Sequence, residues 1–195
     1  MTLPLLSVTP ADWGRAVLTD PIALLADHAW LEKKAATNAL DLLARWPDDW
    51  APGWVEAMTS IARDEAAHLA QVTRILLRRG ARLPRAHKNQ YANDLRQLVR
   101  RGKAIEIVDL LMISALIEAR SCERFGVLAE VSEDAELATF YRALYSSELG
   151  HFQIFLKLAA KIAPLEPRWS ELCAAESEIL AAQPAGPRIH SGYCR

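Results

Sequence analysis

Apolar residues recur every three or four positions along most of the chain, which is the period of an amphipathic α-helix. The first run begins at Asp20-Pro21, a good N-cap and first-turn pair, and the second ends near Gly80. Ser132 is a plausible N-cap for the last run, and Pro164 stops it. The four runs span roughly residues 21–45, 52–79, 104–130 and 132–164. No segment resembles a β-strand, so the sequence predicts an all-α protein.

The connections between these helices indicate how they pack. Short loops join the first helix to the second and the third to the fourth, so each pair is expected to form an antiparallel hairpin. More than twenty residues, Gly80 to Lys103, separate the hairpins and include a short amphipathic helix near residues 89–101. An extra helix is expected near residues 169–183, followed by an irregular tail. The pattern predicts a four-helix bundle with a long crossover and an extra C-terminal helix.

The composition is that of a globular protein, with 195 residues, of which 51% are hydrophobic and 24% charged. A chain of this size can bury one core, so a single domain over residues 1–195 is expected. There is no run of about 18 uncharged apolar residues, and the N-terminus lacks the basic region and cleavage site of a signal peptide. We therefore expect a cytoplasmic protein with no membrane anchor. Three widely spaced cysteines fit neither a disulfide framework nor a zinc site.

The near-zero net charge conceals a strongly basic segment. Ten Lys/Arg and one acidic residue lie between Arg74 and Lys103, which gives this segment a charge of +9 against −10 for the rest of the chain. Such a segment is often only a solvated face, but it is also what a polyanion-binding site requires.

Two Glu-x-x-His pairs interrupt the apolar stripes of the second and fourth helices. Glu65 precedes His68, and Glu148 precedes His151. Residues three apart lie on one helical face, so both side chains of each pair can reach a common point in the core. A lone glutamate on each hairpin partner, Glu32 or Glu118, also lies on an apolar face. The sequence thus predicts six metal-ligating residues: Glu32, Glu65, His68, Glu118, Glu148 and His151.

The chemistry of this set points to two metal ions. Four carboxylates in one core would repel each other strongly and be costly to desolvate, and no Lys or Arg lies on these faces. Two divalent cations with two neutral imidazoles would neutralise the site, and oxygen-rich ligands without thiolates favour iron or manganese over zinc. This arrangement is typical of ferritin-like di-iron proteins. Taken singly, each glutamate could be a boundary residue and each histidine an ordinary core residue.

Glu123 is an alternative to Glu118 in the third helix. The two residues lie about 140° apart around the helix, so only one can face the site. The spacing to Glu148 favours Glu118, and Glu123 is expected to pair with Arg120 or Arg124.

Four segments resemble one known family. They are DHAWLEKKAATNAL around Glu32, IEARSCERFG around Glu118, SELGHF around Glu148 and the closing RIHSG. Together they are similar to the bacterial tRNA-(2-methylthio-N6-isopentenyladenosine) hydroxylases, along nearly the whole chain. The tail departs from the family pattern, because Ile189 stands before His-Ser-Gly where an aromatic residue is expected.

The resemblance implies a tRNA-modifying monooxygenase with a ferritin-like fold and two iron ions, held by the six residues given above. Dioxygen would be the co-substrate, and one of its atoms would enter the isopentenyl side chain of the modified adenosine beside the anticodon. The reaction needs two external electrons and no flavin or haem motif is present, so a separate reductase is expected. There are two alternatives: an iron-storage or peroxide-reducing protein, and a helical RNA-binding module without metal.

The basic crossover is suited to a single-stranded, phosphate-rich anticodon loop. The candidate RNA-binding residues are Arg78, Arg79, Arg82, Arg85, Lys88, Arg96, Arg100 and Arg101.

Overall fold

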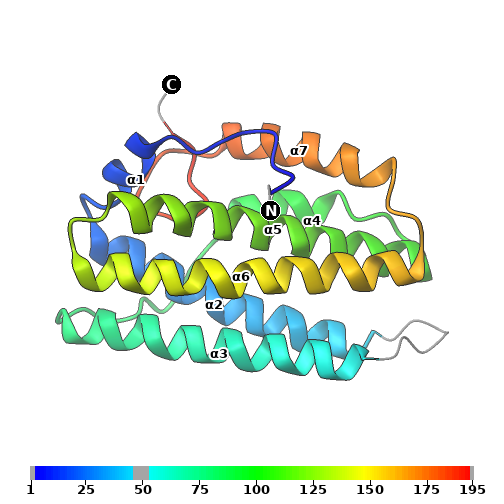
Figure 1. Ribbon diagram of the computed structural model, residues 1–195, viewed down its shortest axis with the longest axis horizontal. Helices are drawn as coiled ribbons and strands as arrows, with labels where there is room; N and C mark the ends of the chain where they lie inside the picture. Colours follow the sequence, from blue (N-terminus) through cyan, green and yellow to red (C-terminus); the bar gives the residue numbers. More distant parts are fainter. Residues whose placement is uncertain (1–2, 46–52, 194–195) are drawn as a thin grey trace.

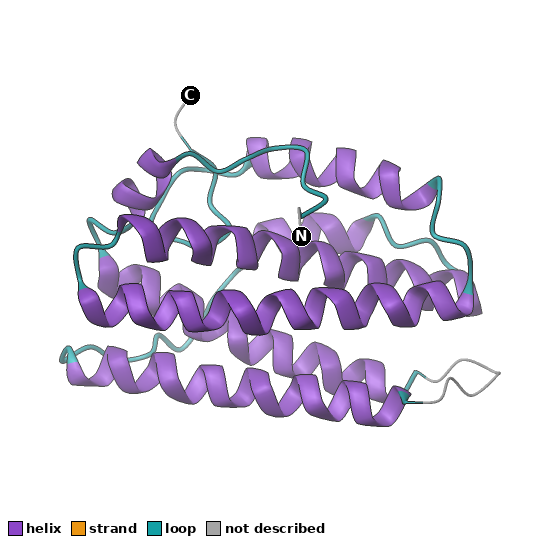
Figure 2. Ribbon diagram, viewed as in Figure 1, coloured by secondary structure: helices purple, strands orange, loops and turns teal. Residues whose placement is uncertain are grey.

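The computed structural model describes residues 3–45 and 53–193, and α-helices account for most of them (Figure 2). Their bounds are α1 (Ala11–Val17), α2 (Pro21–Leu43), α3 (Trp54–Arg78), α4 (Gln90–Gln97), α5 (Lys103–Val131), α6 (Ala135–Ile162) and α7 (Arg168–Ala182). Within the described ranges, the only β-type pairing is one isolated bridge between Ala185 and Gly192. The predicted all-α class is therefore confirmed.

Four long helices form the body of the molecule. Helices α2 and α3 pack as one antiparallel hairpin, α5 and α6 pack as the other, and α3 faces α6 (Figure 1). The crossover from α3 to α5 carries α4, which packs against α5 and α7. Two antiparallel hairpins joined by a single long crossover make a ferritin-like four-helix bundle. This topology brings one face of each long helix to the same central space.

Side-chain caps stabilise the starts of α2, α4 and α6. The Asp20 carboxylate accepts a hydrogen bond from the Ala23 N–H at 3.0 Å, which caps α2 as expected. The N-cap prediction at Ser132 is wrong, because Ser132 is the C-cap of α5 and the Asp134 carboxylate caps α6. Asp134 accepts from two backbone N–H groups of the first turn, at 2.9 and 3.2 Å. A carboxylate directly at the helix start satisfies these groups better than a hydroxyl two residues earlier.

Helix α1 was not predicted, because seven residues are too short to show a helical period. It packs against α5, and its Trp13 and Val17 side chains are buried. Cys122 and Cys173 are buried free thiols, and Cys194 lies outside the described residues. No helix in the described ranges is both long and apolar enough to span a membrane.

Buried apolar side chains form two clusters, one in each half of the bundle. One contains Trp54, Met58, Phe152 and Phe155, together with the first half of α5. The other contains the N-terminal half of α2, the C-terminal half of α3 and the ends of α5 and α6 that face them. On α3, for example, the first cluster ends at Ala62 and the second begins at Val72. The polar residues predicted to bind metal lie between these two apolar halves.

Candidate metal centre

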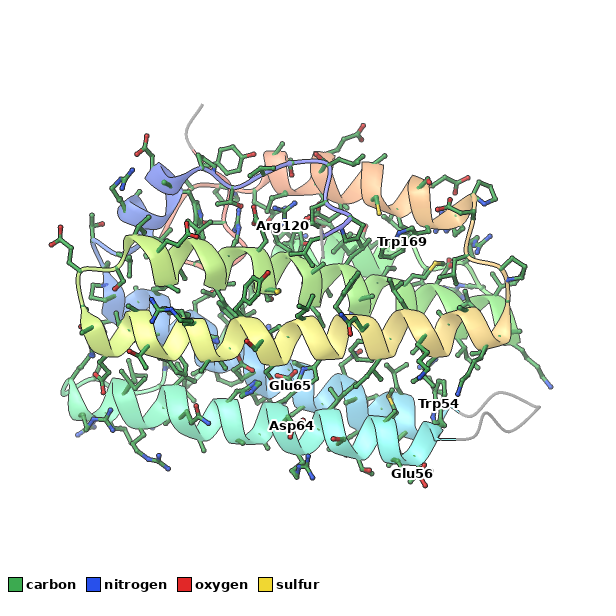
Figure 3. All side chains as sticks on the ribbon, in the orientation of Figure 1. Trp54, Glu56, Asp64, Glu65, Arg120 and Trp169 are labelled. Atoms are coloured by element: carbon green, nitrogen blue, oxygen red, sulfur yellow. The ribbon has the colours of Figure 1, made fainter. Side chains whose placement is uncertain are left out.

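All six predicted ligand residues lie together at the middle of the bundle, and all are buried. Each hairpin supplies one half of the set: Glu32 from α2 with Glu65 and His68 from α3, and Glu118 from α5 with Glu148 and His151 from α6. Glu65 lies on the side of α3 that faces the rest of the bundle (Figure 3). The three-residue spacing of each Glu-x-x-His pair is what brings both its side chains to this side.

The six side chains divide into two overlapping groups of four. Glu32 and His68 complete one group, Glu118 and His151 complete the other, and Glu65 and Glu148 belong to both. Within each group the candidate ligand atoms all lie within 4.8 Å of one another. Two shared carboxylates, each flanked by one terminal carboxylate and one imidazole, are the arrangement expected for a pair of neighbouring cations.

The two histidines approach carboxylates of the opposite hairpin. His68 Nδ1 lies 3.1 Å from Glu148 Oε1, and His151 Nδ1 lies 2.8 Å from Glu65 Oε1. His151 Nδ1 is also 3.0 Å from Glu148 Oε2 on its own helix. Each shared carboxylate therefore contacts a histidine from across the bundle, which connects the two hairpins through the site.

The carboxylates are electrostatically unfavourable where they lie. Burial raises the pKa of the Glu118 carboxyl well above its usual range, and the charges of Glu65 and Glu148 add to this effect. Burial also raises the pKa of Glu65, with a further contribution from Glu32. Both shifts show that the site resists the accumulation of negative charge.

The neighbouring carboxylates raise the pKa values of the two imidazoles, which favours their positively charged forms. Burial alone would lower their pKa values, but the close approach of Glu148, Glu32 and Glu65 raises the pKa of His68 to about 12. Glu148 and Glu65 likewise raise the pKa of His151 to about 11, against the same effect of burial. The site thus requires positive charge at its centre, which either protons or metal cations can supply.

The donor atoms fit metal ions better than a closed hydrogen-bond network. Glu65 Oε1, His68 Nδ1 and Glu148 Oε1 are buried and have no hydrogen-bond partner of acceptable geometry, although other polar atoms are close. Buried polar atoms of this kind are costly unless something else satisfies them. Four carboxylates and two imidazoles without a thiolate are a suitable donor set for iron or manganese. The buried cluster is therefore compatible with a two-metal centre.

Glu123 does not face this site. Its carboxylate accepts a hydrogen bond from Arg120 Nη1 at 3.0 Å and one from the Thr9 hydroxyl at 2.7 Å. The expected pairing with Arg120 is confirmed, and the choice of Glu118 over Glu123 agrees with the geometry.

Sequence reasoning missed two residues that support the candidate ligands. His28 is fully buried and its Nε2 lies 2.5 Å from Glu32 Oε1. Burial lowers the pKa of His28 to about 4, so its ring is neutral. Asp64 Oδ2 lies 3.6 Å from His151 Nε2, on the side of the ring away from the site. Both residues can orient a ligand side chain, and His28 had a signal in its position one helical turn before Glu32.

A cavity of about 180 Å³ leads to the site between α2, α4 and α5. Glu32, Glu65, Glu118 and Glu148 line its inner part. Apolar side chains line its walls, namely Leu31, Ala35, Ile117 and Phe125, and polar side chains of α2 and α4 also border it, namely Lys34, Asn38, Asn93 and Arg96. The candidate metal centre is therefore reached through a partly apolar cavity bordered by basic and amide groups.

The eight basic residues of the crossover are not equivalent. Three are paired with acidic side chains: Arg78 with Glu136, Arg79 with Asp134 and Glu136, and Arg100 with the buried Asp109. The other five are exposed and have no ion pair within the described part of the chain: Arg82, Arg85, Lys88, Arg96 and Arg101. Arg96 donates a hydrogen bond to Asn38 Oδ1 at 3.3 Å and borders the cavity. Charge alone does not distinguish, in the sequence, the arginines that pair with carboxylates from those that do not.

Comparisons with known proteins agree with this geometry. The chain is 41% identical over 191 residues to the tRNA 2-(methylsulfanyl)-N(6)-isopentenyladenosine(37) hydroxylase of Pseudomonas putida, covering 94% of this chain and 90% of that protein. It is 30% identical over 168 residues to the protein of the same name from Salmonella typhimurium, covering 85% of this chain and 61% of the relative.

A solved structure shows the same architecture. It is described as protein 43 with aldehyde deformylating oxygenase activity from Synechococcus, and it superimposes with a TM-score of 0.90 at 33% identity, covering 98% of this chain and 97% of that one. A family model described as tRNA-(MS[2]IO[6]A)-hydroxylase (MiaE) matches residues 3–191. This match extends from before α1 to the buried tail and includes all six candidate ligands. The chain therefore belongs to the tRNA-(MS[2]IO[6]A)-hydroxylase (MiaE) family.

Proposed function

We propose that this protein hydroxylates the isopentenyl side chain of 2-methylthio-N6-isopentenyladenosine beside the tRNA anticodon, as a single ferritin-like domain acting in the cytoplasm. The observation that carries the proposal is the cavity that runs from Lys34 and Arg96 to the four buried carboxylates. A site for iron storage or peroxide reduction needs no such cavity for an organic ligand. The function named for the Pseudomonas and Salmonella relatives supports the same assignment.

The size of the cavity suits the proposed substrate. At about 180 Å³ it exceeds the engineered apolar cavity of roughly 150 Å³ that binds benzene, a molecule of six carbons. An isopentenyl group has five carbons and no polar atom, so Leu31, Ala35, Ile117 and Phe125 can surround it and exclude water. Lys34, whose Nζ also lies 3.0 Å from His87 Nδ1, and Arg96, which also donates to Asn38 Oδ1, would contact phosphate groups of the anticodon loop.

The six candidate ligands would hold two iron ions. Bound there, iron would supply the reduction of dioxygen and the insertion of one oxygen atom into a C–H bond of the side chain. The chain's own residues hold the ligand groups in place: His28 fixes the orientation of Glu32, and Asp64 contacts the outer nitrogen of His151. Each hydroxylation consumes two electrons and two protons and releases one water, so we expect a separate reductase as electron donor.

The proposal is tested by nucleoside analysis of tRNA from cells with and without the gene. Cells lacking the gene are expected to lose the hydroxylated nucleoside and to accumulate its unhydroxylated precursor. Reintroducing the gene should restore the product, and the purified protein should contain about two iron ions per chain. Unchanged tRNA in the deletion strain would rule out this function and favour iron storage or peroxide reduction.

We also propose that all eight basic residues of the crossover contact tRNA, with the largest contributions from the five that have no ion pair among residues 3–45 and 53–193. Arg78, Arg79 and Arg100 would have to exchange a carboxylate partner for a phosphate. Arg82 and Arg85 are exposed and need make no such exchange.

Replacing both free arginines, Arg82→Ala with Arg85→Ala, is expected to weaken tRNA binding and its dependence on salt. Each lost phosphate contact should reduce the slope of log K against log [salt] by about 0.7, the value for single strands. Binding titrations at several salt concentrations measure this slope. The matched control is Arg15→Ala with Arg142→Ala, two exposed arginines outside the crossover. An equal slope in both double variants would show that Arg82 and Arg85 do not contact tRNA phosphates.

A further inference from the structure

The C-terminal tail forms part of the wall of the substrate cavity. Its backbone is held on both sides: the Ile189 N–H donates to Asp27 Oδ2 at 2.9 Å, and the Arg124 guanidinium donates to the Ile189 carbonyl oxygen. The Trp13 indole N–H donates to Ser191 Oγ at 3.0 Å. As a result Ile189, His190 and Ser191 are buried although they lie near the end of the chain.

The His190 ring is fixed by a hydrogen bond at each nitrogen. Nδ1 lies 3.2 Å from Asn89 Nδ2, and Nε2 lies 3.1 Å from Ser121 Oγ. Asn89 Oδ1 already accepts from the Ala92 N–H as the cap of α4, which orients the Asn89 NH₂ group toward His190. Nδ1 is therefore the acceptor, and the proton on Nε2 is donated to Ser121. Two hydrogen bonds and near-complete burial give this side chain a single orientation.

His190 also separates two cavities. It lines the cavity of about 180 Å³ that reaches the candidate ligands, and it lines a second cavity of about 40 Å³ beside Lys88, Gln90 and Gln183. Leu31 and Asn89 are the other residues common to both linings. Three residues thus line both spaces, and His190 is the one contributed by the tail.

We propose that His190 determines the length of the apolar side chain that the cavity accepts. This inference rests on the proposed function, which places a five-carbon N6 substituent in the larger cavity. With the imidazole of His190 in place beside Ser121, the larger cavity has no room for an N6 substituent longer than the isopentenyl group. Without it, the space extends into the second cavity, and a ten-carbon geranyl group can occupy both. The ring acts here as a rigid filler, and its hydrogen bonds serve to keep it in position.

The test compares three RNA ligands bound to the full-length protein. Each is an anticodon stem-loop, with adenosine that is unmodified, N6-isopentenylated or N6-geranylated at the position next to the anticodon. Dissociation constants are measured without turnover, so the result does not depend on electron supply. The wild type is expected to bind the isopentenyl ligand most tightly. In His190→Ala, the preference for isopentenyl over geranyl should fall by about tenfold or more, because additional apolar surface becomes buried.

Three further variants separate loss of the wall from loosening of the tail. Leu31→Ala shortens another of the side chains that line both cavities and should shift the preference in the same direction, even if His190→Ala fails to fold. His190→Phe refills the space without the hydrogen bonds and should retain the wild-type preference. Ser191→Ala removes the Trp13 contact of the same tail and should also retain it, because Ser191 does not line the larger cavity.

Two negative results have different meanings. If the wild type binds all three stem-loops equally, the cavity does not hold the N6 substituent and the proposed function fails with the inference. If the wild type prefers the isopentenyl ligand and a folded His190→Ala keeps that preference unchanged, the inference alone is overturned; where His190→Ala does not fold, an unchanged preference in Leu31→Ala overturns it.

Discussion

Replacing Glu65 with alanine is expected to abolish metal binding and tRNA hydroxylation together. Glu65 belongs to both groups of candidate ligands, so its loss deprives each metal position of a donor. It is also the contact of His151 from the opposite hairpin, at 2.8 Å. We expect iron content to fall from about two ions per chain to near zero, and the hydroxylated nucleoside to become undetectable.

The same substitution should leave the helices intact. In the absence of metal, removing one of four buried carboxylates relieves repulsion and desolvation, so metal-free Glu65→Ala should unfold at the same or a higher temperature than the metal-free wild type. Iron analysis, circular dichroism and tRNA nucleoside analysis measure these effects. Glu130→Ala, which removes an exposed glutamate of α5, is the matched control and should behave as wild type. Full iron content in Glu65→Ala would show that the ligand assignment is incorrect.

Replacing Arg120 with methionine is expected to cause the largest loss of stability. Arg120 is fully buried on α5, where that helix faces α7 (Figure 3). Its guanidinium donates to both carboxylate oxygens of Glu176 at 2.8 and 3.0 Å, and to the Ser7 carbonyl at 3.1 Å. Removing Arg120 leaves the buried Glu176 carboxylate with the Tyr91 hydroxyl as its one hydrogen-bond donor among the described residues, so the free energy of unfolding should fall by about 3–5 kcal/mol.

A double-variant cycle distinguishes loss of the ion pair from loss of packing. Arg120→Met combined with Glu176→Leu removes both charges and should recover most of the lost stability. Arg15→Ala breaks an exposed pair with Asp12 and should change the free energy of unfolding by no more than about 0.5 kcal/mol. Chemical denaturation of the wild type, Arg120→Met, Glu176→Leu, the double variant and Arg15→Ala measures these differences. A loss for Arg120→Met as small as that for Arg15→Ala would contradict the expected role.

The sequence was sufficient to place the six candidate ligands because each lies within a long helix. In a regular helix the direction of a side chain follows from its position, so Glu65 and His68 must point the same way. The preference for Glu118 over Glu123 had the same basis, and the contact between Glu123 and Arg120 agrees with it. Helical periodicity can be recognised from neighbouring residues alone, and the positions of the six candidate ligands follow almost entirely from it.

The parts that were not predicted depend on contacts between distant segments. Asn89 and His190 are 101 positions apart and share no periodic pattern, so nothing in the sequence places the tail beside the cavity. The pairing of Arg100 with Asp109 depends on the path of the backbone from the crossover into α5. The charge of the crossover does not reveal this path. For the same reason the basic segment was recognised as a whole, while its free and paired arginines were not distinguished.

The position of the polar site between two apolar clusters has a consequence for maturation of the protein. Each end of the bundle holds all four long helices through its own buried side chains, such as Trp54 and Phe155 at one end and Leu24 and Tyr141 at the other. The polypeptide is therefore expected to reach its folded structure without the proposed metal ions, unlike small zinc domains that fold only with their metal. Loading of the proposed iron ions would then be a binding reaction of an already folded protein, whose rate depends on iron supply and on release of the protons held by the candidate ligands.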